Sequence, residues 1–411
     1  MRVHIIGGGV AGLAAAIGCV ERGVAVTLYE AAPQLGGRCR SYRHDEFGCD
    51  LDNGAHAVLA NNAAVHRYLK TIGATDRLAT FGRHGLPFVD VRDRATWKLH
   101  LPQGLWAKSA RPPGTSAWDL ICSARLLWGS ANKAAHTSLN ASITAVEKLW
   151  EPLCTSALNT PLIEADAALL STVVRGMMGW SGLRSGLKLP VHSLTHTYLA
   201  PAQEWLQRHG GIVHLQSPLR DVGKSNTHVE RLIFSQTEVT VQAADAVVFA
   251  LPPWAPVWRQ LGLNFDILAL SPIVNVHFRI APTHASRFVG LIGGLSQWLW
   301  VHDGVATVTI SAADAHMNTD GDTLAKTIWT EIAPLLGDPQ MPLPPVHVVK
   351  ERRATIRHVP GVAAYRPAIR TIFQNVFLAG DWVNTGLPCT LESAVQAGFS
   401  AGLACLMPGL R

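Results

Sequence analysis

The start of the chain carries the feature that most restricts its fold, a run of glycines between two apolar segments. The glycines at positions 7, 9 and 12 have the spacing Gly-x-Gly-x-x-Gly. An extended apolar segment, residues 3–6, precedes them, and an alanine-rich helix is predicted to continue to about residue 22, where Gly23 ends it. This order of strand, glycine turn and helix is typical of the first unit of a Rossmann-like parallel sheet.

The residues after this unit indicate that it binds a dinucleotide. Residues 24–29 are predicted to form the second strand, which leads into Glu30, eighteen positions after Gly12. Gly7 allows a tight turn, Gly9 lets a pyrophosphate approach the backbone, and the helix N-terminus attracts its charge. The Glu30 carboxylate suits a free ribose 2′-hydroxyl and would repel a 2′-phosphate, which disfavours NADP.

The same glycines argue against a membrane span at this position. Residues 3–20 contain no Asp, Glu, Lys or Arg and reach the length at which a spanning helix is considered. Gly7, Gly8, Gly9 and Gly12 interrupt that stretch and would weaken such a helix. No other stretch is long and apolar enough to cross a bilayer, so we expect a soluble or peripheral protein.

Downstream of Glu30 the chain resembles the flavoprotein amine oxidase and phytoene desaturase superfamily. The resemblance rests on the Gly-Gly-Arg loop at 36–38, Asp-Asn-Gly-Ala-His at 52–56, Gly-Gly at 210–211, the segment 244–252, and Gly-Asp-Trp at 380–382 with a predicted helix over 390–406. It implies FAD as the cofactor. The residues expected to bind FAD are Gly7, Gly9, Val10, Ala11, Gly12, Glu30, Ala31, Gly36, Gly37, Arg38, Asn53, Gly54, Ala55, His56, Val222, Gly380, Asp381 and Leu391.

Three segments are similar to the squalene-associated branch of this superfamily, the hydroxysqualene dehydroxylases of bacterial hopanoid synthesis. They are residues 150–161, 351–355 and 380–392. The branch usually has Gly-Gln-His where this chain has Gly54-Ala55-His56. The resemblance covers the whole chain and implies FAD-dependent reductive dehydroxylation of hydroxysqualene to squalene, in which reduced flavin delivers hydride to an allylic, cation-like carbon after loss of water.

The cofactor motifs lie at both ends and in the middle of the chain, so the FAD-binding domain is expected to be discontinuous, at residues 1–60, 205–255 and 345–411. The substrate-binding domain is expected at 61–204 and 256–344. Residues 61–204 have helical spacing, 102–114 suggest a loop, and 273–280, 288–292, 297–301 and 306–310 are predicted strands. The expected fold is α/β (α+β overall): a Rossmann-like FAD-binding domain with an inserted helical-plus-antiparallel-sheet substrate domain.

The implied reaction needs a proton donor, because hydroxide is a poor leaving group. His56 is the catalytic candidate, since its motif places it near the flavin and an imidazole titrates near neutral pH. A second possibility is that His56 only orients the cofactor through backbone hydrogen bonds. His192 and His196 could face the cavity, but with 18 His in the chain a structural role is favoured for each.

Two residues near the last predicted helix have simpler interpretations than catalysis. Glu392 lies in its first turn, where a carboxylate ordinarily interacts with the helix dipole or caps the helix. Cys389 precedes the helix and invites a thiolate or covalent-flavin hypothesis, but no base accompanies it, so a small packed side chain is favoured. The 7 Cys form no Cys-x-x-Cys pair, so neither a metal site nor a disulfide framework is predicted, and a reducing compartment is expected.

The composition limits the classes of partner that the protein is expected to bind. Lys and Arg number 35 against 29 Asp and Glu, a net charge of +6 without a basic patch, so no nucleic-acid partner is expected. The sequence contains no second Gly-x-Gly-x-x-Gly fingerprint, so a stable nicotinamide site is not indicated and the electron donor to FAD is unknown. Seven of the 13 Trp lie between residues 97 and 205, at Trp97, Trp106, Trp118, Trp128, Trp150, Trp180 and Trp205. They could line a dry tunnel for a C30 isoprenoid, pack in a core, or contact a membrane. The last possibility predicts a cytoplasmic protein that is peripheral to the inner membrane face.

Other members of the superfamily set the competing hypotheses. Carotenoid and phytoene desaturases or isomerases also take long polyenes, and sequence does not reveal redox direction. An amine oxidase would be expected to place a lysine and an aromatic cage by the flavin. A prenyl-lipid-binding escort without chemistry is disfavoured, because the glycines, Glu30, Arg38 and Asp381 are all retained.

Overall fold

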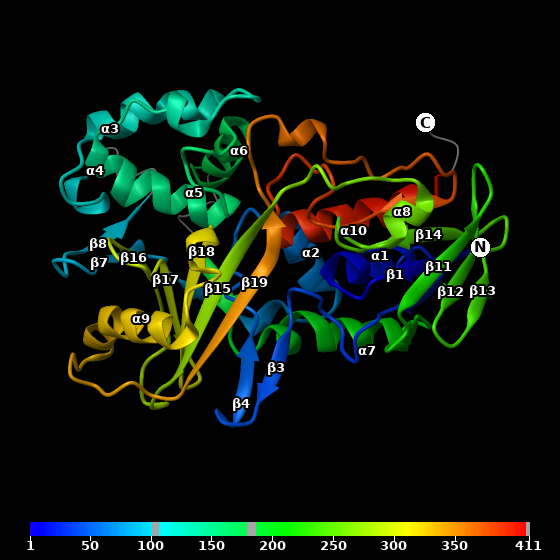
Figure 1. Ribbon diagram of the computed structural model, residues 1–411, viewed down its shortest axis with the longest axis horizontal. Helices are drawn as coiled ribbons and strands as arrows, with labels where there is room; N and C mark the ends of the chain where they lie inside the picture. Colours follow the sequence, from blue (N-terminus) through cyan, green and yellow to red (C-terminus); the bar gives the residue numbers. More distant parts are fainter. Residues whose placement is uncertain (101–106, 179–185, 408–411) are drawn as a thin grey trace.

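The computed structural model describes residues 1–100, 107–178 and 186–407. Two large sheets form the two ends of an elongated molecule, with the N- and C-termini at the same end (Figure 1). Helices and parallel and antiparallel strands all contribute, so the predicted mixed α/β class is confirmed. The division into domains at the boundaries given above stays a prediction.

The first sheet is entirely parallel and begins with the strand predicted before the glycines. Its strands, in spatial order, are β10 (Ile212–His214), β2 (Ala25–Tyr29), β1 (Arg2–Ile6), β14 (Ala246–Phe249) and β20 (Val376–Leu378). Apolar side chains alternate along β1, so Val3 and Ile5 pack with the helices on one face. The helices of this layer are α1 (Val10–Val20), α2 (Ala63–Thr71), α7 (Ala200–Arg208) and α10 (Leu391–Cys405). The predicted first unit and last helix are therefore confirmed to within two residues.

Helices α1 and α10 bring the two ends of the sequence into direct contact. A methyl group added at Gly398 of α10 would overlap the Ala11 carbonyl oxygen of α1, and one added at Gly402 would lie 2.9 Å from the Ala15 carbonyl oxygen. The Cys19 thiol donates to the Gly402 carbonyl. Glycine is thus required in α10 because only a bare backbone lets the two helices approach this closely.

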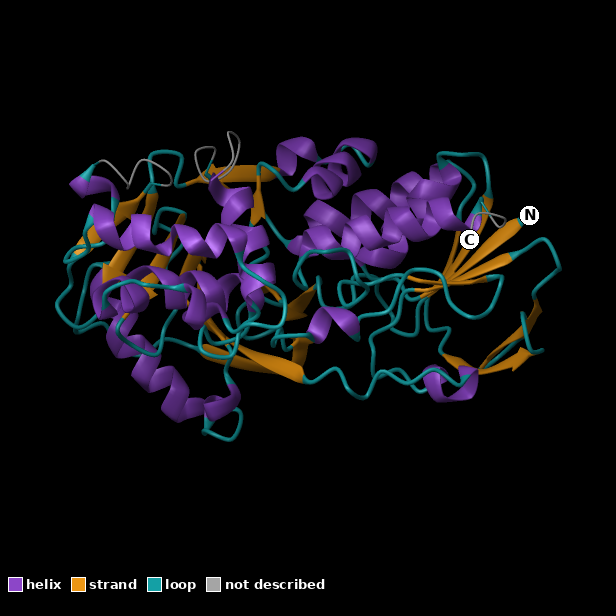
Figure 2. Cartoon of the chain, turned by 90° about the horizontal axis from the view of Figure 1, so that it is seen from above, coloured by secondary structure: helices purple, strands orange, loops and turns teal. Residues whose placement is uncertain are grey.

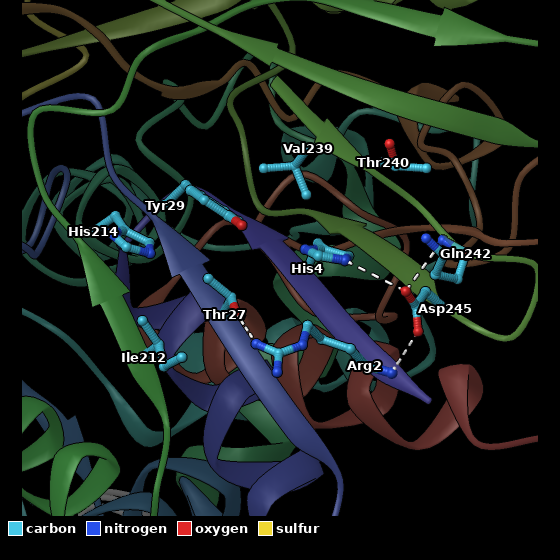
Figure 3. Close-up of a pocket in the computed structure, with 10 residues that line it drawn as sticks. All are labelled: Arg2, His4, Thr27, Tyr29, Ile212, His214, Val239, Thr240, Gln242 and Asp245. Atoms are coloured by element: carbon cyan, nitrogen blue, oxygen red, sulfur yellow. Dashed lines mark hydrogen bonds and ion pairs between the residues drawn. The ribbon is translucent and has the colours of Figure 1, made fainter. Parts of the chain in front are cut away.

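A three-stranded meander covers the opposite face of the parallel sheet (Figure 2). It consists of β11 (Leu219–Lys224), β12 (Val229–Phe234) and β13 (Glu238–Thr240), with α8 (Val257–Leu261) beside β11. A cavity of about 350 Å³ remains between sheet and meander, lined by His4, Tyr29, His214 and Asp245 among others (Figure 3). None of its lining residues is a predicted cofactor residue.

The second sheet has seven strands and an apolar face packed on α9 (Gly321–Leu336). In spatial order the strands are β19 (Val346–Ile356), β15 (Leu270–Arg279), β18 (Val305–Ser311), β17 (Trp298–His302), β16 (Arg287–Ile292), β7 (Leu86–Asp90) and β8 (Thr96–Leu99). The four predicted strands are confirmed. Two expectations are corrected, because β7 and β8 come from the segment predicted to be helical, and β7 pairs in parallel with β16. That pairing joins residues some two hundred positions apart, which local spacing cannot reveal.

Helices from the 117–178 segment form a layer at the outer end of the molecule (Figure 1). They are α3 (Ala117–Cys122), α4 (Ile143–Ala145), α5 (Glu151–Leu158) and α6 (Ala167–Met178). Helical spacing from Trp118 to Trp128 is realised as α3 followed by a 3₁₀ segment, η4 (Ser123–Trp128). Part of the predicted loop 102–114 lies outside the described residues, and its remainder includes the 3₁₀ turn η3 (Lys108–Ala110).

Two small sheets and several short turns complete the described chain. The sheets are β3 (Ser41–His44) with β4 (Cys49–Asp52), and β5 (Val58–Leu59), β9 (Leu187–Pro190) and β6 (Leu78–Phe81). The 3₁₀ turns are η1 (Thr75–Arg77), η5 (Ala135–Ser138), η9 (Asp314–His316) and η10 (Val362–Ala364), and the π-helical segments are η6 (Val146–Trp150) and η8 (Thr195–Leu199). Across residues 1–100, 107–178 and 186–407, none of the helices combines the length and the apolarity that a bilayer crossing requires.

Candidate functional site

The glycine turn between β1 and α1 has the geometry of a phosphate-binding loop. Gly7 has a φ of 108° and donates from its N–H to the Tyr29 carbonyl. A methyl group at Gly12 would overlap the Gly7 carbonyl oxygen, so the fold itself requires glycine at both positions. Gly9 differs, because an added methyl group would meet only the Gly36 oxygen, 3.9 Å away. The open space over Gly9 is the kind of cradle that a pyrophosphate fills.

Glu30 and the Gly-Gly-Arg loop lie against this turn. The Glu30 carboxylate accepts hydrogen bonds from the Gly8 N–H at 2.6 Å and the Ala32 N–H at 2.8 Å, which fix its orientation at the end of β2. The Gly36 N–H donates to the Gly8 carbonyl at 2.9 Å. Two motifs separated in the sequence therefore meet where a ribose and a pyrophosphate are expected.

Arg38 joins this loop to the motif near the C-terminus. Its guanidinium donates to the Asp381 carboxylate at 2.6 Å and to the Ala354 carbonyl. Asn53 donates from its side-chain amide to the Arg38 carbonyl at 3.0 Å. The positions predicted at 38, 53 and 381 thus form one cluster, in which a charge pair and a buried amide lie close together.

His56 belongs to the same cluster. Burial of the imidazole, assisted by the positive charge of Arg38, lowers its pKa to about 4, although hydrogen bonds with the Asn53 and Arg38 backbone act in the opposite direction. The ring is therefore uncharged at neutral pH. It can donate a hydrogen bond from its N–H, but it is not an imidazolium acid.

The remaining predicted cofactor residues occupy less central positions. Val222 lies on β11 opposite Leu232 of β12, with its side chain in the core, and its N–H donates to the Asp221 carboxylate. Val10 and Ala11 begin α1 and are buried, and Leu391 begins α10 after the N-cap Thr390. Gly37 has a φ of 57° and Gly380 a φ of 150°. Ala31 is exposed, and Ala55 packs against the core.

Arg366 is a functional residue that the sequence did not suggest. It is buried and donates to four backbone carbonyls of the loop after β20. Those acceptors are Asp381, Trp382, Val383 and Leu387. Its guanidinium holds the Asp381 loop in place, and a lone Arg in a loop carries no sequence signal for such a role.

The three segments that resemble the squalene-associated branch meet at one junction. Asn159, in the left-handed conformation at the end of α5, donates from its side chain to the Thr355 hydroxyl at 3.0 Å. The Thr160 hydroxyl accepts from the His358 N–H, and the His358 ring accepts from the Cys389 N–H at 2.9 Å. These residues connect α5, β19 and the loop before α10, so they position the cofactor loop relative to the second sheet.

The other candidates have structural roles or lie elsewhere. Both carboxylate oxygens of Glu392 accept N–H groups at the start of α2, from Ala64 and Val65, so it caps a neighbouring helix. Burial raises the pKa of Cys389, whose thiol donates to the Asp381 carbonyl, which fits a packed side chain. His192 and His196 line a second cavity of about 360 Å³ with His302 and Asp303, outside the Arg38 and Asp381 cluster.

Taken together, these residues fit FAD. The cradle over Gly9 suits a pyrophosphate, Glu30 is held as a ribose acceptor, and the Arg38 and Asp381 cluster lies beside the loop that contains Gly54 and His56. Gly54 can approach a flat ring system because it has a φ of 94° and no side chain.

Comparisons with known proteins agree with this geometry. The family model for flavin containing amine oxidoreductases matches residues 10–404. Hydroxysqualene dehydroxylases from Rhodopseudomonas palustris and Sinorhizobium fredii are 36% and 34% identical, over 99% and 97% of both chains respectively. Among solved structures, an oxidoreductase from Methanosarcina mazei superposes with a TM-score of 0.73 at 14% identity, covering 97% of this chain and 99% of that one. The chain belongs to the flavin containing amine oxidoreductase family, in the branch that contains the hydroxysqualene dehydroxylases.

Proposed function

We propose that the protein is an FAD-dependent hydroxysqualene dehydroxylase, which replaces the hydroxyl group of hydroxysqualene by hydrogen and yields squalene. The observation that carries this proposal is the 34–36% identity to hydroxysqualene dehydroxylases over 97–99% of the chain. A probable zeta-carotene desaturase matches over a similar share of this chain at only 22%. The proposed function is therefore favoured over desaturation.

The chemistry that FAD supplies when bound is two-electron reduction. The glycine turn and Glu30 would hold its diphosphate and ribose, and the Arg38 and Asp381 pair would lie beside the flavin loop. Replacing a hydroxyl by hydrogen consumes two electrons and two protons and releases one water. The protein must therefore bind a long apolar chain, keep bulk water away and place a hydrogen-bond donor at the departing oxygen.

His56 is the proposed donor at the departing oxygen. Since its pKa is about 4, the ring acts as a neutral donor at physiological pH. This role differs from that of an imidazolium acid, and it makes His56 insensitive to pH over the range in which most enzymes are assayed.

Aromatic side chains form a largely buried band on the face of the seven-stranded sheet opposite α9. Phe288 and Trp298 stack with ring centroids 4.9 Å apart, and the edge of Phe81 meets Trp300 at 4.8 Å. Phe88 contacts both Trp97 and Trp298. A band of this kind suits a polyene, because it removes water and accommodates isoprene units without polar partners.

The proposed function is tested by incubating dithionite-reduced holoenzyme with 12-hydroxysqualene under anaerobic conditions and analysing the extract by mass spectrometry. Squalene is expected to form in proportion to reduced enzyme, and oxidised enzyme without dithionite serves as the control. The proposal fails if no squalene appears while phytoene or an amine exchanges electrons with the flavin instead.

We further propose that the protein takes its substrate from an anionic membrane through α3 and α4. Trp118 and Trp128 are 69% and 77% exposed, and Ile143 is 78% exposed, whereas Leu120 and Leu126 of the same segment are buried. We call Trp118, Ile121, Trp128 and Ile143 the outer apolar surface. Trp106 and Trp180 lie outside the described residues, and Trp97 and Trp150 are buried.

Charge around the outer apolar surface complements anionic lipid. Residues 98–146 contain five Lys or Arg, and Asp119 is their one acidic residue. Asp119 is buried and its carboxylate accepts from Ser116 and Ser142, so it contributes little to the surface potential. Exposed Trp and basic side chains together favour the headgroup region of a bilayer.

Liposome flotation tests the membrane proposal. Wild-type protein should float with phosphatidylglycerol vesicles, and W118S/W128S should lower the bound-to-free ratio about tenfold or more. I372S removes a side chain of equal exposure, 70%, from the segment before β20 and serves as the matched control. The membrane proposal is wrong if wild-type protein stays at the bottom of the gradient or if W118S/W128S floats as well as I372S.

A further inference from the structure

The face of the seven-stranded sheet opposite α9 is divided into a polar and an aromatic half. Val276 on β15, Val308 on β18 and Leu299 on β17 all pack toward α9. The residues that alternate with them point the other way, so Asn275 and Thr309 share this face with Trp298. The register places these three side by side, since Thr309 is paired with Asn275 on one side and Trp298 on the other.

Asn275 lies directly over the loop that contains His56. A methyl group in place of the Gly54 hydrogen would be 3.3 Å from the Asn275 amide nitrogen. Asn275 is only 2% exposed, and it is polar in a strand whose neighbours Val274 and Val276 are fully buried. A buried amide in such a strand is costly unless it is satisfied, which indicates a specific role.

Half of that amide already has a partner. The Thr309 hydroxyl donates to the Asn275 side-chain oxygen at 2.7 Å, and this contact fixes the orientation of the amide. In residues 1–100, 107–178 and 186–407 no group accepts a hydrogen bond from the amide nitrogen, and that nitrogen is not sealed from solvent. Asn275 thus presents a fixed N–H donor at the border between the His56 loop and the aromatic band.

We propose that the Asn275 amide binds the hydroxyl oxygen of the substrate, while Thr309 holds the amide in position. This inference rests on the proposed function, because hydroxysqualene carries one oxygen on an otherwise apolar chain. That oxygen would accept from Asn275, and one arm of the isoprenoid would follow Trp298 and Phe288 along the sheet. The reaction removes the oxygen, so squalene leaves the donor unpaired and is bound more weakly than the substrate.

The experiment compares the affinities of two ligands for oxidised holoenzyme in detergent solution, followed through the flavin absorbance spectrum. Hydroxysqualene should bind wild-type protein about 10- to 100-fold more tightly than squalene, the range expected for one unsatisfied buried donor. N275L keeps the side-chain size and removes this donor but leaves His56, so the ratio should fall about tenfold while the squalene affinity stays within about twofold.

Two further variants separate recognition from structural damage. T309V should lower the ratio by a smaller factor, because the amide is kept and only its anchor is lost. T307V removes a hydroxyl from the same face, where Thr307 pairs with His277, and should keep the wild-type ratio. FAD content and melting temperature show whether each variant is folded. If N275L does not fold, the affinity ratio of T309V tests the role of the Asn275 amide.

The result that overturns this inference is an unchanged ratio in both N275L and T309V. That outcome leaves the proposed function intact if wild-type enzyme still forms squalene. If wild-type protein neither converts hydroxysqualene nor prefers it to squalene, the proposed function itself is wrong.

Discussion

Acid should destabilise this protein through His358, a histidine at the junction between the cofactor loop and the second sheet. The ring is fully buried, donates from Nδ1 to the Leu158 carbonyl at 2.7 Å and accepts at Nε2 from the Cys389 N–H at 2.9 Å. A proton on Nε2 would face another N–H group. Burial is the main cause that lowers its pKa from 6.5 to about 4.

The sign and size of the effect follow from proton linkage. Between pH 7 and pH 4 the unfolded chain binds a proton on this ring that the folded protein refuses, so stability falls as pH falls and levels off below the folded pKa. At pH 5 the difference between 6.5 and about 4 amounts to about 2 kcal/mol of lost unfolding free energy, against a few tenths at pH 7.

The test is urea denaturation of FAD-saturated protein at pH 7.5 and pH 5 for wild type, H358Q and H84Q. Glutamine does not titrate, so H358Q should be less stable than wild type at pH 7.5, and the gap should shrink by about 2 kcal/mol at pH 5. His84 is exposed, and H84Q should follow wild type at both values. Equal acid sensitivity of wild type and H358Q would show that His358 is not the source of the acid-induced loss of stability.

Three further predictions follow from contacts at the site. G9A should keep near-normal apo stability in calorimetry but bind FAD at least about tenfold more weakly in a flavin titration, because its methyl group would occupy the cradle. G12A should instead yield little folded protein, and normal FAD binding by G9A would contradict the cradle. H56A should retain FAD and turn over about 10² times more slowly, and wild-type rates should show no ionisation of His56 between pH 5 and 8, so near-normal H56A turnover would exclude the donor role. E392A should cost about 1 kcal/mol of stability with unchanged turnover, since it uncaps α2, and E230A, on the exposed meander, is the control in denaturant titrations.

The parts of the fold that were predictable are those in which the signal is local. The glycine spacing identified β1, the turn and α1 because the close approach of Gly12 to Gly7 lies within that one unit. Four strands of the second sheet were found from their apolar pattern, and the last helix from the motif resemblance around Gly380. Motif resemblance brought together Arg38, Asn53 and Asp381, whose contacts the structure then supplied.

Other parts depend on partners that are distant in the chain. Strands β7 and β8 lie in a segment with helical spacing, and their place beside β16 is a long-range pairing. Arg366, His358 and Asn275 act through backbone carbonyls, a remote N–H group and a neighbouring strand, respectively. Nothing in their local sequence distinguishes them from an ordinary loop arginine, a core histidine or a strand polar residue.

The contact between α1 and α10 has a consequence for how the protein matures. A ribosome releases the glycine turn and α1 first, but Asp381 and the helix that packs on Ala11 and Ala15 follow more than 350 residues later. Until α10 has emerged, the nascent chain carries half a flavin site and an α1 whose apolar face is uncovered. We expect a chain cut before Gly398 to bind no flavin and to expose that face to proteases and to aggregation.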